Sequence, residues 1–397
     1  MKQLFYKTIV LFLIPISILG QMDSLTPKLE KIEQLGYLPG FAVAIVSKDG
    51  VLYKKGFGYA DLESKRPYTT NSLQNIGSIS KTLTGLCLLK LVEEGKLKLD
   101  TPINNFLTTN LYNPYHPKVP ITIEHLANHT SSIIDPDEYE HTYLFSKKID
   151  LTENQIPEDM KEYVSIYNKN QTMPVIDFVE SMIHPLGKWY SKKNFSRKKP
   201  GTQYNYSNMG AAIAGHIIEQ ITGKTYLEYT QEVILNPFKM TQSGWKHRDV
   251  NMDQFVSLYL SNNQKIPPYE LISYADGGLI TNVSDMGLYL SEMIKGYHGG
   301  ASNILSSDSF QQLLHPKSIA DERYSGIFWQ TIGSSHIGHT GGDPGIMAIM
   351  SFEPKTGYGY IVFTNKTDND GDGYNQLVHT WKTMQEFMKE KMNKTNP

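Results

Sequence analysis

Apolar residues gather near both ends of the chain in short runs that are separated by turn residues. Near the start, residues 41–47 and 51–59 flank Asp49-Gly50, a pair typical of a tight hairpin turn. Near the end, turn residues separate four further apolar runs, which cover residues 327–332, 336–340, 346–352 and 358–364. The pattern predicts two groups of antiparallel strands.

Helical spacing of apolar residues surrounds and separates these strand groups. A helix is expected over residues 24–35, and an amphipathic helix over residues 376–392. The long middle of the chain is mostly helical in pattern, most clearly over residues 81–94, 123–128, 207–222 and 226–235. We therefore expect an α/β (α+β) fold, in which an antiparallel sheet built from both chain ends is flanked by the terminal helices and carries a mostly helical inserted domain.

The same order of elements divides residues 21–397 into two subdomains. The sheet subdomain is expected over about 24–75 and 272–397, and the helical subdomain over about 76–271. Small-molecule sites often lie where two such units meet. We expect the substrate site at a cleft between them.

The first twenty residues have the pattern of a secretory signal peptide. Lys2 and Lys7 precede the apolar run of residues 8–19, and small Gly20 offers a cleavage point. The run is shorter than the roughly 20 apolar residues of a membrane span, so no stable span is expected. We predict export to the periplasm or the extracellular space, with an uncleaved anchor as the alternative.

Composition narrows the class of partner. The 397 residues are 40% hydrophobic and 20% charged with a formal net charge of -2, which gives no reason to expect a nucleic acid as partner. A small-molecule, peptide or ester substrate fits better. The one cysteine, Cys87, has no partner for an internal disulfide and lies in an apolar helical stretch, so we expect it to be buried.

A basic segment interrupts the helical region between residues 130 and 200. Six basic side chains lie shortly before the tyrosine motif described below: Lys188, Lys192, Lys193, Arg197, Lys198 and Lys199. A solvated surface loop is the favoured interpretation. Attraction of a carboxylate substrate is the alternative.

The first candidate chemical motif is Ser78-Ile79-Ser80-Lys81. Ser78 precedes an apolar helix, so main-chain N–H groups of its first turn can stabilise negative charge, and Lys81 at i+3 reaches the hydroxyl. A proton acceptor requires a partly neutral Lys81 amine, which desolvation between the two subdomains and nearby cations would favour. The alternative is a helix cap beside a surface charge. Ser196-Arg197-Lys198-Lys199 has the same spacing but no apolar helix after it.

The second motif is Tyr206-Ser207-Asn208, which opens a predicted helix. A tyrosinate held near Lys81 could take the Ser78 proton and return it to the leaving group. Asn208 could hold a substrate amide and orient Lys81. The alternative is a helix start with a half-buried tyrosine and a capping asparagine.

The third motif, His339-Thr340-Gly341-Gly342, ends a predicted strand. The glycines permit close approach of a substrate to the main chain, whose N–H groups could complete an oxyanion hole. His339 would add a switchable charge or a hydrogen bond opposite Tyr206. Lys355-Thr356-Gly357 is a second candidate for this role, but a solvent-facing hairpin tip explains it better.

Together the motifs resemble the serine beta-lactamase and penicillin-binding fold family, closest to class C beta-lactamases, DD-peptidases and related esterases. The resemblance covers about Leu35 to Thr364. It includes three further segments: Ile123-Glu124-His125-Leu126-Ala127-Asn128-His129-Thr130-Ser131, Pro200-Gly201-Thr202-Gln203-Tyr204 and Gly277-Gly278-Leu279.

This resemblance implies roles for the motif residues. Ser78 would be the acylated nucleophile, with Lys81 and Tyr206 handling its proton. The N–H groups of Ser78 and Gly342 would form the oxyanion hole. Substrate would be bound by the second and third motifs, through Asn208, His339, Thr340 and Gly341.

Three positions depart from the family pattern. His339 stands where class C beta-lactamases usually have lysine, so efficient penicillin hydrolysis is not implied. Ser132 replaces a usual glycine, and Asp276 replaces a usual small residue.

We therefore expect an exported serine hydrolase that cleaves an amide or ester bond through a Ser78 acyl-enzyme, with cell-wall material among the candidate substrates. The alternative is a penicillin-binding-like sensor that is acylated at Ser78 without turnover.

No cofactor or metal is expected. His125 and His129 lack the zinc-protease order of residues. The segment from Asp368 to Gly373 matches only half of a calcium loop.

Overall fold

The computed structural model describes residues 22–150, 156–315, 317–318 and 324–395. The predicted signal peptide, residues 1–20, lies outside this range. Within the described part of the chain, no helix combines the length and the apolar character needed to cross a membrane.

A nine-stranded antiparallel sheet forms the centre of the fold, in the strand order β10-β11-β12-β13-β14-β15-β1-β2-β3. The principal strands are β1 (Gly40–Ser47), β2 (Gly50–Asp61), β12 (Gln330–Ile332), β13 (His336–Asp343), β14 (Ile346–Glu353) and β15 (Tyr358–Thr364). The edges are short: β3 (Arg66–Pro67), β10 (Lys317–Ser318) and β11 (Tyr324–Ser325). β1 pairs with β15, so the sheet joins the two ends of the chain as predicted.

The predicted strand over residues 327–332 begins later than expected. Phe328 has a left-handed main chain (φ 58°) and its N–H donates to the carbonyl of Ala127 in the helical part. This conformation cannot continue a strand. Only Gln330–Ile332 joins the sheet.

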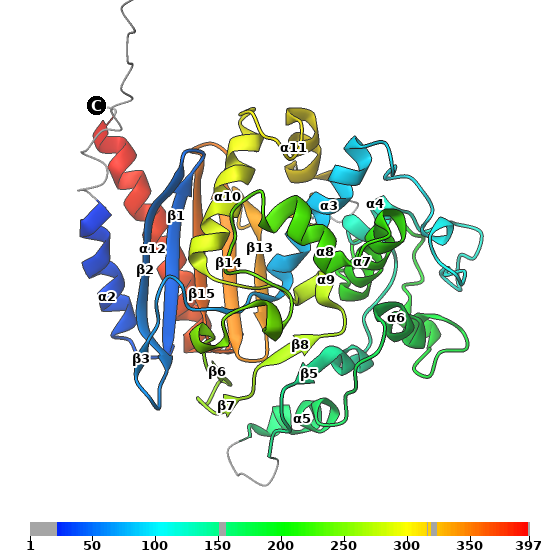
Figure 1. Ribbon diagram of the computed structural model, residues 1–397, viewed down its shortest axis with the longest axis horizontal. Coiled ribbons are helices and arrows are strands. Elements are labelled where there is room, and N and C mark those ends of the chain that lie inside the picture. Colours follow the sequence, from blue (N-terminus) through cyan, green and yellow to red (C-terminus); the bar gives the residue numbers. More distant parts are fainter. Residues whose placement is uncertain (1–21, 151–155, 316, 319–323, 396–397) are drawn as a thin grey trace, which may run out of the picture.

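Helices cover both faces of the sheet (Figure 1). α2 (Thr26–Glu33) and α12 (Asp372–Thr395) lie on one face, and α10 (Val283–Tyr297) lies on the other. Residues of β1 alternate between the two cores: Val43 packs on the α2 and α12 side, and Ala44 on the other. Because both faces are covered, β1 is apolar along most of its length. The sequence analysis missed α10.

The inserted region is mostly helical, as predicted. Its helices are α3 (Lys81–Glu93), α4 (Ile123–Ala127), α5 (Lys161–Tyr167), α6 (Val175–Ile183), α7 (Asn208–Thr222), α8 (Tyr226–Thr230) and α9 (Tyr274–Gly277), and α11 (Ser307–Leu314) follows α10. Three small strand pairs connect them: β4 (Gln74–Asn75) with β9 (Ile280–Thr281), β5 (Tyr143–Phe145) with β8 (Tyr269–Leu271), and β6 (Leu258–Tyr259) with β7 (Lys265–Ile266).

Several single-residue expectations are met. Cys87 is fully buried in α3. The six basic side chains of residues 188–199 are exposed, and the Arg197 guanidinium lies 5.6 Å from the centre of the Tyr115 ring. Asp368 accepts a hydrogen bond from the Gly373 N–H (2.7 Å) at the start of α12. The carboxylate at the first position of the partial calcium loop therefore caps a helix.

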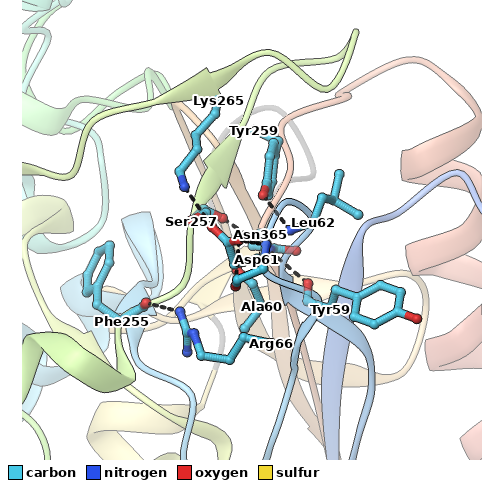
Figure 2. A network of polar contacts seen from close by, with 11 residues as sticks. Tyr59, Ala60, Asp61, Leu62, Arg66, Phe255, Ser257, Tyr259, Lys265 and Asn365 are labelled. Carbon is cyan, nitrogen blue, oxygen red and sulfur yellow. Dashed lines mark hydrogen bonds and ion pairs between the residues drawn. The ribbon is translucent and has the colours of Figure 1, made fainter.

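A buried polar network ties the end of β2 to the segment around β6 and β7 (Figure 2). Asp61 accepts hydrogen bonds from Lys265 Nζ (2.6 Å), the Ser257 hydroxyl and the Ser64 N–H (2.7 Å). Burial acts to raise the pKa of Asp61, but the bonds from Lys265 and Ser257 outweigh it and hold the pKa well below its usual range. The ionised Asp61 side chain therefore links two segments that are far apart in the sequence.

We expect Asp61→Asn to lower the free energy of unfolding by about 1–3 kcal/mol at pH 7, because charge-assisted hydrogen bonds are lost. The folded-state pKa is depressed, so the carboxylate stabilises the fold above the unfolded-state pKa of about 3.9 and this contribution fades as pH falls below it. Urea unfolding at pH 7 and at pH 3.5 should show the difference shrinking. Asp49→Asn, in the exposed β1–β2 turn, is the control, and an equal effect there would contradict the prediction.

Candidate active site

Ser78 lies on a single 3₁₀ turn (Gly77–Ser80) that leads directly into α3. Almost every residue of α3 is buried, so the predicted buried helix after Ser78 is confirmed. Gly77 has a positive φ of 55°, and a Cβ there would lie 3.0 Å from the Gly342 N atom. The serine turn is thus packed against β13, while Ser78 itself stays half-buried.

Lys81 is completely buried at the start of α3 and uses all three of its N–H donors. Its Nζ donates to Ser78 Oγ (3.0 Å), Asn208 Oδ1 (2.6 Å) and the Asp276 carbonyl (2.8 Å). These bonds join the first two motifs, which are 127 residues apart in the sequence.

The protonation state expected for Lys81 is wrong. Burial acts to lower its pKa, but the neighbouring Tyr206 and Asp276 outweigh burial, and the pKa lies above its usual value. The side chain is therefore a buried ammonium rather than a partly neutral amine. The acidic surroundings come from residues far away in the sequence, which the motif alone did not show.

Tyr206 faces Lys81, whose Nζ lies 5.0 Å from the ring centre. The ring stacks on His129 at 4.4 Å, and its centre is 6.1 Å from that of His339. Its hydroxyl is buried and has no hydrogen-bond partner among the described residues. The hydroxyl interacts electrostatically with the Lys81 ammonium and could bond with a nucleophile proton or a substrate.

Asp135 fixes the start of α7, which carries the second motif. Its Oδ1 accepts from the Ser207 hydroxyl (2.8 Å) and the Met209 N–H (3.1 Å), and its Oδ2 accepts from the Asn208 N–H (2.5 Å). The sequence analysis missed this residue. It lies between residues 130 and 200, more than 70 positions from its partners, where no local pattern points to it.

We expect Asp135→Asn to lower kcat about tenfold, because its amide N–H₂ would face main-chain donors and shift Asn208 and Tyr206. The same mismatch should cost about 1–2 kcal/mol of stability. Steady-state kinetics and thermal unfolding of the variant measure both. Asp137→Asn, at an exposed neighbouring position, should change neither, and equal kinetics for the two variants would remove Asp135 from this role.

His339 lies in β13 beside this cluster and is buried. Its Nδ1 donates to the Thr340 carbonyl (2.6 Å), which leaves Nε2 as an acceptor without a partner among the described residues. Burial, helped by Lys81, lowers the pKa of His339 to about 3. At neutral pH the His339 ring is therefore uncharged, so the expectation of a switchable charge is wrong. A hydrogen-bonding role for His339 remains a prediction.

The end of β13 presents main chain to solvent beside the nucleophile. Thr340 and Gly342 are exposed, whereas Gly341 packs so tightly on Ile76 that a side chain would collide with its carbonyl. Gly342 N lies beside Gly77, next to Ser78. The geometry is compatible with an oxyanion hole at Ser78 and Gly342, and this role stays a prediction.

The two alternative motifs, Lys355-Thr356-Gly357 and Ser196-Arg197-Lys198-Lys199, lie away from this cluster. Lys355 is exposed at the β14–β15 turn, and Gly357 packs near His298. Met347 pairs with Gly342 and lies six residue steps, about 20 Å of strand, from the end of β14 at Glu353. Lys199 is also exposed, and Ser196 donates to Gln203 in a surface loop.

The two histidines considered as metal ligands, His125 and His129, make other contacts. His125 Nδ1 accepts from the Thr122 N–H (3.2 Å) at the start of α4, and His129 Nδ1 accepts from the Ser207 N–H (3.2 Å). Across the described ranges no group of three or more His, Cys, Asp or Glu residues is placed to hold a metal ion.

The unusual Ser132 occupies a left-handed conformation (φ 65°), which explains why glycine is the usual residue there. Asn113 Nδ2 donates to its hydroxyl (2.9 Å).

Known proteins resemble this chain in sequence and fold. The family model described as Beta-lactamase matches residues 30–380. "Protein flp" of Staphylococcus aureus (strain MRSA252) is 24% identical over 339 residues, which cover 84% of this chain and 60% of that protein. The octameric penicillin-binding protein homologue from Pyrococcus abyssi has a TM-score of 0.66 and 26% identity, covering 87% of this chain and 73% of that one. D-amino acid amidase from Ochrobactrum anthropi SV3 has a TM-score of 0.65 and 20% identity, covering 93% and 99%.

The matches span most of the sheet and of the helical region, so the predicted fold is confirmed. The chain spans about 60% of the length of the first curated relatives it matches. Since the family model covers residues 30–380 of 397, this chain belongs to the beta-lactamase family.

Proposed function

We propose that the protein is an exported serine hydrolase that cleaves an amide or ester bond through an acyl-enzyme on Ser78. Members of the beta-lactamase family are generally serine hydrolases, which supports the reaction class. One observation carries the proposal: the buried Lys81 ammonium bonds to Ser78 Oγ with Tyr206 directly beside it.

The chemistry follows from this geometry. Ser78 Oγ attacks the substrate carbonyl carbon while its proton passes to Tyr206, acting as a phenolate base beside the Lys81 cation. The N–H groups of Ser78 and Gly342 hold the tetrahedral oxyanion. As the carbon–leaving-group bond breaks, Tyr206 returns the proton to the leaving nitrogen or oxygen.

Deacylation repeats these steps with water as the nucleophile. Tyr206 takes a proton from water, the hydroxide oxygen attacks the Ser78 ester, and the proton returns to Ser78 Oγ as the acid product leaves. Lys81 stays protonated throughout and offsets the phenolate charge.

Export and substrate class belong to the same proposal. The pattern of residues 1–20 supports export to the periplasm or extracellular space, and cell-wall peptides are among the candidate substrates. The similar solved structures include a penicillin-binding protein homologue and a D-amino acid amidase, so D-alanyl peptides, amino-acid amides and short acyl esters are the first compounds to test.

Burst kinetics separate an enzyme from a sensor. With p-nitrophenyl butyrate and a cephalosporin, an enzyme releases one equivalent of leaving group rapidly and then turns over steadily. A single stoichiometric burst with a stable Ser78 adduct would favour the sensor. Absence of both release and adduct would reject the proposal.

A further inference from the structure

Buried acidic groups outnumber buried cations around the candidate nucleophile. Asp135, Asp276 and Asp343 all interact electrostatically with Lys81. Burial and Lys81 hold the pKa values of His129 and His339 below their usual range, so neither ring adds positive charge at neutral pH. Lys81 alone therefore faces three carboxyl groups.

Only one of the three carboxyl groups has partners for both of its oxygens. Asp135 is satisfied at the start of α7. Asp276 is 3% exposed, and its Oδ2 is buried without a partner among the described residues. Asp343 Oδ1 accepts from the Tyr143 hydroxyl (2.7 Å), but its Oδ2 is likewise buried and unpartnered. Two buried acceptor oxygens thus lack a donor, which is costly unless a ligand supplies one.

Both carboxyl groups belong to residues that adjoin the candidate catalytic groups. The Asp276 carbonyl accepts from Lys81 Nζ, and Asp343 directly follows Gly342. A Cβ on Gly277 would lie 3.4 Å from Asp343 Oδ2, and one on Gly77 would lie 3.1 Å from the same oxygen. Both positions are glycine, so neither residue covers this oxygen with a side chain.

The missing partner must donate hydrogen bonds and carry positive charge. A primary ammonium is compact, has three donors and offsets the excess of acidic groups. Asp343 directly follows Gly342, which is expected to hold the acyl oxygen, and its Oδ2 lies beside Gly77, the residue before Ser78. We therefore place such a group on the acyl part of the substrate. A neutral donor such as an amide would satisfy the oxygens but would not offset the charge of the carboxyl groups when they ionise.

Resting on the proposed hydrolase function, we propose that Asp276 and Asp343 form a subsite for a protonated amine on the acyl part of the substrate. The preferred substrates are then amides or esters of amino acids with a free amine, rather than N-blocked ones. Burial raises the pKa of Asp343 to about 7 and that of Asp276 well above its usual value. An ammonium in the subsite would favour their ionised forms.

The test compares matched substrates on one enzyme: alanine p-nitroanilide and N-acetylalanine p-nitroanilide, in both D and L forms. Near pH 7.5 we expect kcat/KM to favour the free amine at least about tenfold in one enantiomer, as a charge-assisted bond provides. Asp343→Asn and Asp276→Asn should each reduce this ratio severalfold. Because both substrates are compared on the same variant, the kcat/KM ratio is unaffected by a general loss of activity. Asp308→Asn, exposed in α11, is the control and should keep the wild-type ratio.

A pH profile of the wild-type ratio tests the proposal even if the variants fail to fold. The preference should rise as Asp343 ionises near pH 7 and fall as the substrate amine loses its proton near pH 8. Equal rates for free and blocked substrates, or a ratio unchanged in both variants, would overturn the subsite. If p-nitrophenyl butyrate is hydrolysed in that case, only the subsite fails; if Ser78 is neither labelled nor active, the hydrolase proposal fails instead.

Discussion

Ser78→Ala should abolish covalent labelling by a fluorophosphonate probe and lower turnover of p-nitrophenyl butyrate by about 10³-fold or more, as loss of a nucleophile does in serine hydrolases. The setting of Ser78 is the reason: it is half-buried, bonded to the Lys81 ammonium and adjacent to main-chain N–H groups at the start of a buried helix. Intact-mass spectrometry after probe treatment reads the adduct directly.

Ser196→Ala is the matched control for this prediction. Ser196 has the same spacing to a lysine, but its hydroxyl bonds to Gln203 in a surface loop, and Lys199 is exposed. Its loss should leave labelling and turnover near wild-type values. Labelling that survives in Ser78→Ala and disappears in Ser196→Ala would mean that the motif was chosen wrongly.

Local patterns were sufficient to predict the sheet and the buried helix that follows the candidate nucleophile. The run from Phe41 to Ser47 is apolar because β1 is covered on both faces, and Asp49-Gly50 makes the turn to β2. Ser78 could be found because a short motif and the buried helix after it lie side by side in the sequence. In each case the determining contacts are within a few residues of one another.

Long-range contacts explain what the sequence did not reveal. The charge of Lys81 depends on Tyr206 and Asp276, which are more than a hundred residues away, so desolvation alone gave the wrong protonation state. The role of Asp135 depends on the approach of a distant helix start. The neutral His339 follows from its burial beside Lys81, which a strand pattern does not show.

The missed helix α10 has a different cause. Asn282 caps its first turn by accepting from the Asp285 N–H (2.9 Å), so a start signal exists in the sequence. Its buried residues occupy most of its surface because it packs between the sheet and α11. An apolar helix that is covered on several sides lacks the polar stripe by which amphipathic helices are recognised.

Tyr206→Phe should separate activity from stability. We expect turnover to fall by about 10²–10⁴-fold, the usual contribution of a general base or acid. The effect on the fold should be small, because two contributions oppose each other. Loss of a buried hydroxyl without a geometric hydrogen-bond partner among the described residues favours the variant by about 1–3 kcal/mol, whereas loss of the interaction between Tyr206 and the Lys81 ammonium disfavours it, so the melting temperature should change little. Steady-state kinetics and thermal unfolding of the same preparation measure both effects.

Tyr204→Phe, two residues away, is the comparison variant, because the Tyr204 hydroxyl has a hydrogen-bond partner. Its ring also contacts His129, but its hydroxyl accepts from Gln330 Nε2 (3.1 Å). Its loss should cost about 0.5–1.5 kcal/mol of stability and have a much smaller effect on turnover. If Tyr206→Phe kept full turnover, proton transfer would have to be reassigned to Lys81, whose buried ammonium would then need to lose a proton when substrate binds. If Tyr206→Phe instead lowered stability as Tyr204→Phe does, its hydroxyl would have a partner in the free protein, and the phenol would be a structural group.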